Sequence, residues 1–415
     1  MPSRDPRVVI IGAGVAGITA GVVLEQAGFE NFVIVEKGSD VGGVWHWNRY
    51  PGLTCDVPSQ IYQFGFAPKP DWSQIWAEGS EIQRYHREAI ETVGKRIAVI
   101  GSGSTGVQVV SALQPQAAAL TQFARTPQWV LWAPMGLRQP RLVAKLLAAA
   151  PAAHQRLYST LLWGSGILAD IALKPTWRRR AAQQLARWSL TTQVRDRELR
   201  TALTPDYEPF CKRQVLSGTY HRAIGADNAA LVTEPISEIT ETGLRTADGT
   251  HHDLDLIVFA TGFHPHNYMR PMNLRGRDGL SIDEAWAKGP RAYRMTAIPG
   301  FPNLFTVLGP NSPTGSISLQ YSAELTARYI TQWLERFRDG EFETVEVTEE
   351  ATVRFNDSVA EAMGPTVWNT GCNSWYFTEE NTIDLWPFDR KTMTALLTAP
   401  DDRDFLIGHK DGNLR

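Results

Sequence analysis

The sequence predicts an α/β fold built around two similar strand–helix–strand units. Two glycine patterns of the form GxGxxG lie 89 positions apart, at Gly12, Gly14 and Gly17 and at Gly101, Gly103 and Gly106. Each follows a short apolar run typical of a buried strand, over 7–11 and 95–100, and each precedes a stretch with helical spacing, over 18–26 and 107–113. This order of elements indicates two Rossmann-like dinucleotide-binding domains.

Each glycine turn is expected to hold a pyrophosphate group. Without a side chain, glycine lets the backbone turn tightly and approach the phosphates, whose charge then lies at the amides and positive dipole end of the following helix. In the second turn Ser104 and Thr105 stand between the last two glycines, so we include them in the predicted contacts. One such pattern alone also occurs in ordinary glycine-rich turns, so the flanking strands and helices carry the prediction.

The residue that ends the next strand distinguishes the two sites. Glu36 lies nineteen residues after Gly17, where the apolar run 32–35 ends. Arg125 lies nineteen residues after Gly106, at the end of the corresponding run. A carboxylate accepts hydrogen bonds from a ribose diol, whereas an arginine suits a 2′-phosphate. The first site is therefore predicted to bind FAD and the second NADPH, and the alternative is two unrelated surface charges.

The composition describes an ordinary globular protein of two or three domains. Of the 415 residues, 43% are hydrophobic and 20% charged, and the net charge of −3 gives no reason to expect nucleic-acid binding. The charge is uneven, because residues 137–200 hold twelve Lys or Arg against three Asp or Glu. A solvated basic helix face is the favoured interpretation of this region, with NADPH phosphates or an anionic membrane surface as alternatives.

The spacing of cysteine, histidine and apolar residues argues against several further classes of protein. Cys55, Cys211 and Cys372 are far apart and form no CxxC pair, which favours a reducing compartment and argues against a disulfide framework or a dithiol redox centre. The nine histidines show no metal-ligand spacing, so no metal site is expected. We recognise neither a signal region nor a membrane-spanning segment, and therefore expect a cytoplasmic location.

The chain is expected to divide into two domains. Residues 1–93 together with 262–415 are assigned to a discontinuous FAD-binding domain, and residues 94–261 to an NADPH-binding domain. A basic, mostly helical region is inserted into the second domain over about 137–200. Further elements are expected in the first domain, with helices at 80–91 and 322–338 and a strand at 303–308.

Six further stretches carry distinctive motifs, at 42–45, 48–62, 125–127, 205–213, 260–262 and 368–376. In this order they resemble the Baeyer–Villiger branch of the class B flavin monooxygenases, over most of the chain. The resemblance implies FAD and NADPH as cofactors, with O₂ and a small ketone or sulfide as substrates. In that family NADPH reduces the flavin and O₂ adds at flavin C4a. The resulting peroxide then inserts oxygen into a ketone, which gives an ester or a lactone.

The resemblance also implies roles for single residues. Arg213 would supply the fixed positive charge that a buried peroxide anion needs, and Asp56 would orient it. Arginine suits this role because it stays protonated in proteins. Lys212 and Arg125 would bind the NADPH 2′-phosphate, and Thr126 the adjoining ribose. The flavin side of the site would include Gly43, Trp45, Thr54, Asp56 and Tyr62. Simpler alternatives are a surface cation at Arg213, a turn cap at Asp56 and core packing of the two aromatic residues.

One part of the family pattern is absent. The fingerprint Phe-x-Gly-x-x-x-His-x-x-x-Trp should precede the second glycine turn, but residues 91–95 run directly from the expected helix into the next strand. About seventy residues expected from the resemblance are missing, including one strand of the FAD-domain sheet. The five residues 92–96 reach at most about 17 Å, so the helix must end close to the NADPH domain.

This departure makes the FAD half incomplete and leaves other functions open. A parallel sheet that lacks an internal strand leaves backbone groups unpaired unless its neighbours close the gap. One alternative is a sulfur- or nitrogen-oxygenating enzyme or an uncoupled NADPH oxidase. Another is a remnant that binds NADPH and holds no flavin. The sequence makes no prediction of oligomeric state.

Overall fold

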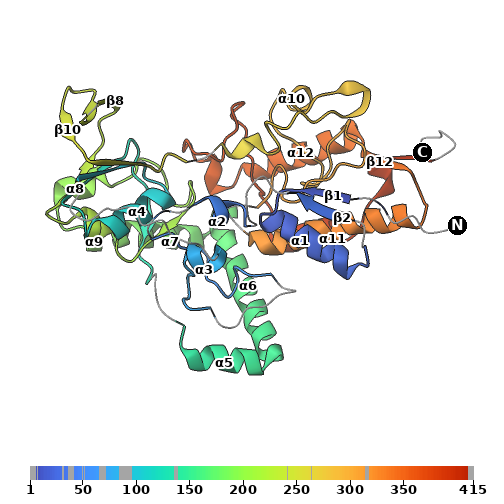
Figure 1. Ribbon diagram of the computed structural model, residues 1–415, viewed down its shortest axis with the longest axis horizontal. Coiled ribbons are helices and arrows are strands. Elements are labelled where there is room, and N and C mark those ends of the chain that lie inside the picture. Colours follow the sequence, from blue (N-terminus) through green and yellow to red (C-terminus); the bar gives the residue numbers. More distant parts are fainter. Residues whose placement is uncertain are drawn as a thin grey trace.

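The two glycine units lie in separate halves of an elongated molecule, with the first on the right and the second on the left of Figure 1. The computed structural model describes residues 6, 8–29, 32–35, 42–48, 50, 52–64, 72–83, 96–134, 139–240, 242–262, 264–313 and 317–409. Glu36 and residues 92–95, which the sequence singled out, lie outside these ranges. The predicted domain boundaries stay predictions.

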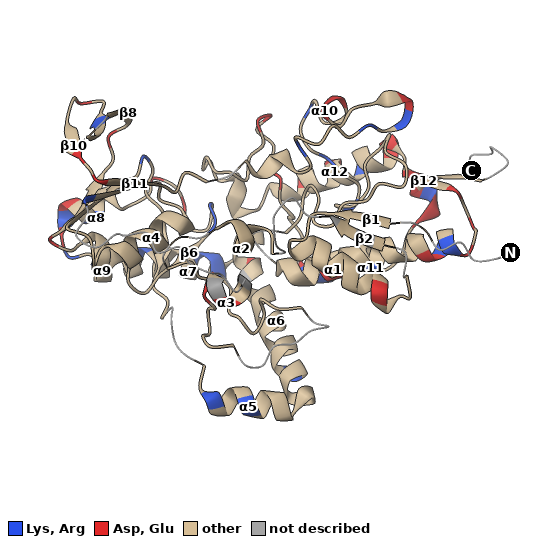
Figure 2. Cartoon of the chain, in the orientation of Figure 1, with Lys and Arg blue, Asp and Glu red and all other residues tan. Residues whose placement is uncertain are grey.

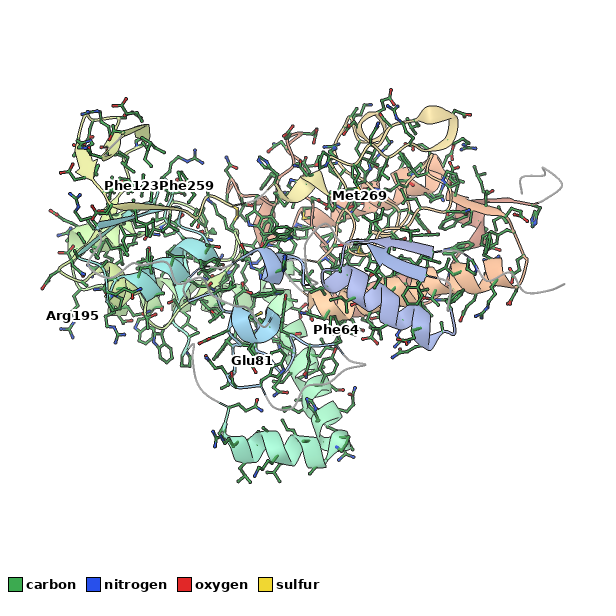
Figure 3. The ribbon with its side chains drawn as sticks, viewed as in Figure 1. Phe64, Glu81, Phe123, Arg195, Phe259 and Met269 are labelled. Carbon is green, nitrogen blue, oxygen red and sulfur yellow. A yellow bond between two sulfur atoms is a disulfide. The ribbon has the colours of Figure 1, made fainter. Side chains whose placement is uncertain are left out.

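The second glycine unit contains a parallel sheet of four strands. Its order is β11 (Leu256–Phe259), β3 (Arg96–Ile100), β4 (Ala119–Phe123) and β7 (Ala229–Val232). Figure 3 shows the carboxyl ends of β4 and β11 near each other, at Phe123 and Phe259. The middle of β3 is fully buried, as expected for a parallel strand with both faces covered.

Helices and a small antiparallel sheet cover the two faces of this sheet. One face packs against α4 (Ser104–Leu113), α7 (Trp177–Gln193) and α9 (Tyr220–Ile224). The other face packs against an antiparallel sheet of β8 (Ile236–Thr240), β9 (Gly243–Thr246) and β10 (His251–Asp253). The short elements β5 (Val130–Leu131), β6 (Val215–Leu216) and α8 (Arg197–Ala202) lie in the same half.

The first glycine unit has a smaller sheet. Among the described residues, only β1 (Val8–Ile11) and β2 (Phe32–Val35) pair here, in parallel, and α1 (Val15–Gln26) connects them. The helix α1 packs against α11 (Leu319–Arg338), which fulfils the helix expected over 322–338. The chain then continues into α2 (Val44–Trp47).

A cavity of about 390 Å³ lies beside β1. It is lined by β1, α1, α11, Met269 (labelled in Figure 3) and residues 303–309. The strand expected over 303–308 is not formed, and only Phe305 makes an isolated bridge, with Ala297. A strand needs a hydrogen-bonded neighbour, and the cavity lies where one would stand. Strand β1 and residues 303–309 thus both line this cavity.

The helix expected over 80–91 is described only in part. It begins as α3 (Gly79–Gln83), and the rest of the expected range lies outside the described residues. The C-terminal region consists of α10 (Ile282–Ala285), β12 (Thr344–Val347), α12 (Glu349–Met363), α13 (Arg390–Leu396) and β13 (Phe405–Gly408), with short 3₁₀ turns between them. Its core is rich in fully buried aromatic side chains, namely Tyr329, Trp333, Trp368, Tyr376 and Trp386.

The first two helices of the basic region project from the body of the molecule. Figure 1 shows α5 (Arg141–Ala149) at the tip of this projection, connected to the body by the long helix α6 (Pro151–Leu173). The side chain of buried His154 on α6 lies within hydrogen-bonding distance of Gln60 and Gln63. Among the described residues, no helix is long and apolar enough to cross a membrane.

The prediction that the cysteines form no disulfide was wrong. Cys211 and Cys372 are joined by a disulfide, although they are 161 residues apart in the sequence. The bond connects the segment just before Lys212 to the C-terminal region. The spacing of cysteines along the chain cannot reveal this pair, because only the fold brings the two residues together. Cys55 is a free, buried thiol. Within the described ranges, no group of His, Cys, Asp or Glu side chains has the arrangement of a metal site.

Candidate active site

The centre of the candidate site is an ion pair between Arg213 and Asp56. The guanidinium donates two hydrogen bonds, from Nε to Oδ2 and from Nη2 to Oδ1, each of 2.9 Å. Burial opposes the charge on Arg213, but the carboxylate of Asp56 outweighs this effect and raises the pKa of the guanidinium. The Arg213 side chain keeps 32% of its surface exposed, so a ligand can reach a charge that is fixed in position.

A short loop holds Asp56 in place. The backbone amide of Cys55 donates to the carbonyl of Ala77 over 2.9 Å, and Thr54 forms an isolated antiparallel bridge with Glu78. The residue before Asp56 is thus tied to a second segment of the chain. Burial also raises the pKa of the Cys55 thiol, which keeps this neighbour of Asp56 neutral.

Two residues near this loop contact the NADPH-type domain. The hydroxyl of Tyr50 donates to Gln108 Oε1 on α4 over 3.0 Å, and Gln108 Nε2 donates to the carbonyl of Thr54 over 3.3 Å. Gly52 lies so close to α4 that a side-chain carbon there would stand 2.8 Å from the Cβ of Ala112. Asp56 therefore belongs to a loop that packs on the first helix of the second unit.

Aromatic side chains lie near the ion pair. The indole Nε1 of Trp45 donates to the Tyr62 hydroxyl over 2.9 Å, and their rings meet edge to face with centroids 5.7 Å apart. Burial raises the pKa of Tyr62, and it raises that of Tyr376 to about 12. Arg213 and Asp56 both influence these two phenols electrostatically, which places the phenols and the ion pair in one neighbourhood.

The first glycine turn has the shape that a pyrophosphate requires. Gly12 has a φ of +95°, and a side-chain carbon at Gly17 would stand 1.8 Å from the Gly12 carbonyl oxygen. Gly14 is the N-cap of α1 and makes no side-chain cap, so the first amides of α1 are left for a ligand. The Cα of Gly43 lies against Gly14, which brings this second motif to the turn.

The second glycine turn has the same shape. Gly101 has a φ of +126°, and a side-chain carbon at Gly106 would stand 2.3 Å from the Gly101 carbonyl oxygen. Gly103 faces open space at the start of α4, which begins at Ser104. The hydroxyl of Thr105 donates over 3.5 Å to Tyr50. The turn thus has room for a phosphate group at the N-terminus of α4.

Two cations lie beside this second turn. Burial lowers the pKa of Lys212, and the charge of nearby Arg125 lowers it further. The Lys212 ammonium lies 4.3 Å from the centroid of the Tyr207 ring, and Arg125 is exposed. The carbonyl of Thr126 accepts a hydrogen bond of 2.6 Å from Ser102, which ties this loop to the glycine turn. A half-buried ammonium with a second cation nearby suits an anionic ligand.

Sequence reasoning missed three residues of this region. Tyr376 lies in a motif that the resemblance used, yet it was not assigned to the site. Tyr50 and Gln108 form the contact between the domains, and neither residue belongs to a glycine pattern. Tyr50 stands in the motif at 48–62, which was a usable signal, whereas no pattern in the sequence indicates Gln108. The roles of the site residues stay predictions.

Comparisons with known proteins place the chain among monooxygenases. Residues 10–78 match a family model for an NAD(P)-binding Rossmann-like domain. An uncharacterized monooxygenase of Mycobacterium tuberculosis is 38% identical, with 97% of each chain covered. A Baeyer–Villiger monooxygenase of Streptomyces coelicolor is 32% identical over 92% of this chain and 88% of the relative. A Baeyer–Villiger monooxygenase of Pseudomonas aeruginosa is 30% identical over 93% of this chain and 88% of the relative.

Solved structures show the same fold. A closed crystal structure of cyclohexanone monooxygenase matches with a TM-score of 0.85 and 23% identity, covering 97% of this chain and 99% of that one. A cyclohexanone monooxygenase from Rhodococcus bound to NADP⁺ matches with a TM-score of 0.83, 23% identity and the same coverage. These matches confirm the predicted fold class of two Rossmann-like domains. The alignment with the mycobacterial relative spans 481 positions, so that relative has residues with no counterpart among these 415.

Proposed function

Because the chain belongs to the Baeyer–Villiger branch of the flavin-dependent monooxygenases, we propose that it uses NADPH, FAD and O₂ to convert a ketone into an ester or a lactone. The observation that carries this proposal is the bidentate Arg213–Asp56 pair, which lies where the loop from the first glycine unit packs on the second. FAD and NADP are the cofactors in a crystal structure of the related OTEMO, whose TM-score to this chain is 0.81.

The described residues fit both cofactors. The turn at Gly12, Gly14 and Gly17 would hold the FAD pyrophosphate at the open N-terminus of α1. Trp45 and Tyr62 would offer aromatic surface to the flavin. When bound and reduced, FAD would supply the oxygen that it has activated from O₂. Glu36 would contact the FAD ribose on this proposal.

The second glycine turn fits NADPH in the same way. The open space at Gly103 leaves room for the pyrophosphate, and the amides of Ser104 and Thr105 at the start of α4 would bind it. Arg125 and Lys212 would bind the 2′-phosphate, whose negative charge would relieve the repulsion between them. Thr126 would lie at the adjoining ribose.

Arg213 would provide the fixed charge of the reaction. An anion that forms in a site with little water is costly unless a positive group already faces it. Asp56 holds the guanidinium through two hydrogen bonds, so it needs no reorientation when negative charge develops nearby. The raised pKa of Arg213 keeps the guanidinium protonated.

A second candidate function is uncoupled NADPH oxidation. The two-stranded sheet and the cavity beside β1 favour it, because a loosely held flavin would release its activated oxygen as hydrogen peroxide and would not transfer it to a substrate. Oxygenation of sulfides would use the same activated oxygen. A remnant that binds only NADPH would contain no flavin. We also infer a cytoplasmic location, where NADPH is supplied.

The test is the amount of product formed per NADPH consumed. The chain is saturated with FAD and NADPH, given cyclohexanone or a thioether, and assayed for ester, sulfoxide and peroxide. We expect the wild-type chain to form ester. We expect R213A to lose about 100-fold in ester formation while it still binds FAD, since one preorganised charge contributes that much. The matched control is R245A, which removes an exposed arginine paired with Glu238 far from the site. Equal ester formation by R213A and R245A would refute the role of Arg213.

A further inference from the structure

Helix α7 exposes a row of large apolar side chains. Trp177 is 73% exposed, Leu185 56% and Trp188 63%. At 100° per residue these three positions fall within one side of the helix, opposite the buried Ala186 and Leu190. The helix has 17 residues and is therefore about 25 Å long.

A third exposed tryptophan lies beside the same helix. The backbone amide of Trp132 donates a hydrogen bond of 3.4 Å to the hydroxyl of Ser189 on α7, and the Trp132 side chain is 58% exposed. We call Trp132, Trp177, Leu185 and Trp188 the tryptophan face. Isolated apolar residues on a surface need no explanation, but three large ones along one helix and a fourth in a segment bonded to it indicate a binding surface.

Basic side chains border the tryptophan face. Arg178 and Arg180 are exposed on either side of the apolar row, and the Arg178 guanidinium lies 5.8 Å from the Trp177 ring centroid. Arg195 projects from the surface just past the end of α7 (Figure 3). Among the described residues, none of these three arginines forms an ion pair with a carboxylate.

Helix α5, at the far end of α6 from the body, has a similar composition. Leu142 and Leu146 are 68% and 59% exposed, one helical turn apart. Arg141 and Lys145 are exposed beside them, and Figure 2 shows their basic positions along α5. The whole chain carries a net charge of −3, whereas residues 137–200 hold twelve cations and three anions. The positive charge is thus concentrated in the region that also exposes the apolar side chains.

We propose that the tryptophan face docks the protein on the surface of an anionic lipid bilayer. Tryptophan prefers the boundary between lipid headgroups and acyl chains, and Arg attracts anionic headgroups. A helix with this pattern lies in the plane of the interface and does not cross it. A symmetric dimer through this face would place two positively charged surfaces against each other, which argues against a second copy as the partner.

The test is flotation of the full chain with vesicles, under conditions that need neither cofactor nor substrate. We expect binding to vesicles of phosphatidylcholine and phosphatidylglycerol in equal parts, weaker binding to phosphatidylcholine alone, and loss of binding in high salt. W177S/W188S and R178E/R180E should each bind the anionic vesicles about tenfold less. The matched controls are I239S and R245E on the antiparallel sheet β8–β9, which change an exposed apolar residue and an exposed cation elsewhere.

The controls should bind like the wild-type chain. Three outcomes would overturn the proposal. The first is that the wild-type chain does not float with anionic vesicles. The second is that W177S/W188S and R178E/R180E float as the controls do. Alternatively, the chain would be dimeric without lipid and W177S/W188S would make it monomeric, which would assign the face to self-association. If the tryptophan variant fails to fold, R178E/R180E still decides the matter, because exposed arginines contribute little packing.

Discussion

In the second glycine unit, Ile97, Ala98 and Val99 of β3 are completely buried between neighbouring strands, whereas Val9 and Ile11 of β1 in the first unit are 60% and 59% exposed. The two turns themselves are alike in φ angle and in the close approach of their first and last glycines. The difference therefore lies in the sheet behind each turn. A glycine pattern specifies local backbone geometry, but the strands around it decide how firmly that geometry is held.

The comparison predicts that NADPH is bound more firmly than FAD. Both turns would present helix amides to a pyrophosphate, yet among the described residues only the second is supported by four strands with both faces covered. The cavity of about 390 Å³ beside β1 leaves the first turn with less support. The predictions that follow test whether the two units differ in this way, from the largest expected effect to the smallest.

The largest effect is expected from a side chain placed in each turn. A carbon at Gly106 would stand 2.3 Å from the Gly101 carbonyl oxygen, and one at Gly17 would stand 1.8 Å from that of Gly12. We expect G106V to abolish detectable NADP⁺ binding while FAD still binds, and G17V to do the reverse. Calorimetric titration of each cofactor measures both constants. The control G164A adds a carbon where nothing lies within 4 Å. Loss of both cofactors in either variant would show that the units do not bind independently.

The next effect concerns the disulfide between Cys211 and Cys372. It closes a loop over 161 residues and ties the segment of Lys212 and Arg213 to the C-terminal region. We expect C211S/C372S to lower the free energy of unfolding by about 5 kcal/mol, because the unfolded chain gains freedom. Denaturant titration measures this change, and the wild-type chain with a reductant should behave in the same way. An unchanged unfolding midpoint in both samples would contradict the expectation.

The second unit should also be the more sensitive to acid. Burial lowers the pKa of His221 on α9 from 6.5 to about 4. The unfolded chain binds this proton more readily, so the stability contributed by neutral His221 is complete above pH 6.5 and is lost as the pH falls towards 4. The loss amounts to roughly 3 kcal/mol. Unfolding of the wild-type chain and of H221L at pH 7 and at lower pH measures it. An identical pH dependence in the two proteins would exclude His221 as the cause.

The smallest effect is expected when the cations predicted to bind the 2′-phosphate of NADPH are removed. Removal of both cations in R125A/K212A should weaken NADPH binding about 30-fold and leave NADH binding nearly unchanged, because only NADPH carries that phosphate. The ratio of the two dissociation constants is the measurement, with R245A as the control. A ratio that does not change would remove the basis for assigning the second unit to NADPH.

The sequence predicted the parts of the structure that local patterns determine. The glycine turns and the strands before them follow from residues that are close together in the chain, whereas β4 ends at Phe123, two residues before the predicted end at Arg125. The pair of Arg213 with Asp56 was found through motifs of a known family, since the two residues are 157 positions apart. Tyr50 and Tyr376 lie in motifs of that family, but no pattern indicated the disulfide, the contact of Tyr50 with Gln108 or the position of Tyr376 beside the ion pair. These contacts depend on how the two halves pack, which no local pattern encodes.

For residues 303–308 the sequence predicted a strand that the structure does not form. Its apolar sequence is typical of a strand, but a strand forms only where a neighbour supplies hydrogen bonds. In this chain the position beside β1 is a cavity, so residues 303–308 remain irregular apart from the bridge at Phe305. Sequence patterns therefore overestimate structure where a partner strand is missing.

The most direct measurement is reduction of bound FAD by NADPH without oxygen. The chain is saturated with FAD, mixed with NADPH under anaerobic conditions in a stopped-flow instrument, and followed by the visible absorbance of the flavin. If the two glycine units form one active site around Arg213 and Asp56, the flavin absorbance will be bleached by NADPH, with little bleaching by NADH. A chain that binds FAD but shows no bleaching with NADPH, or one that binds no FAD at saturation, would contradict the account.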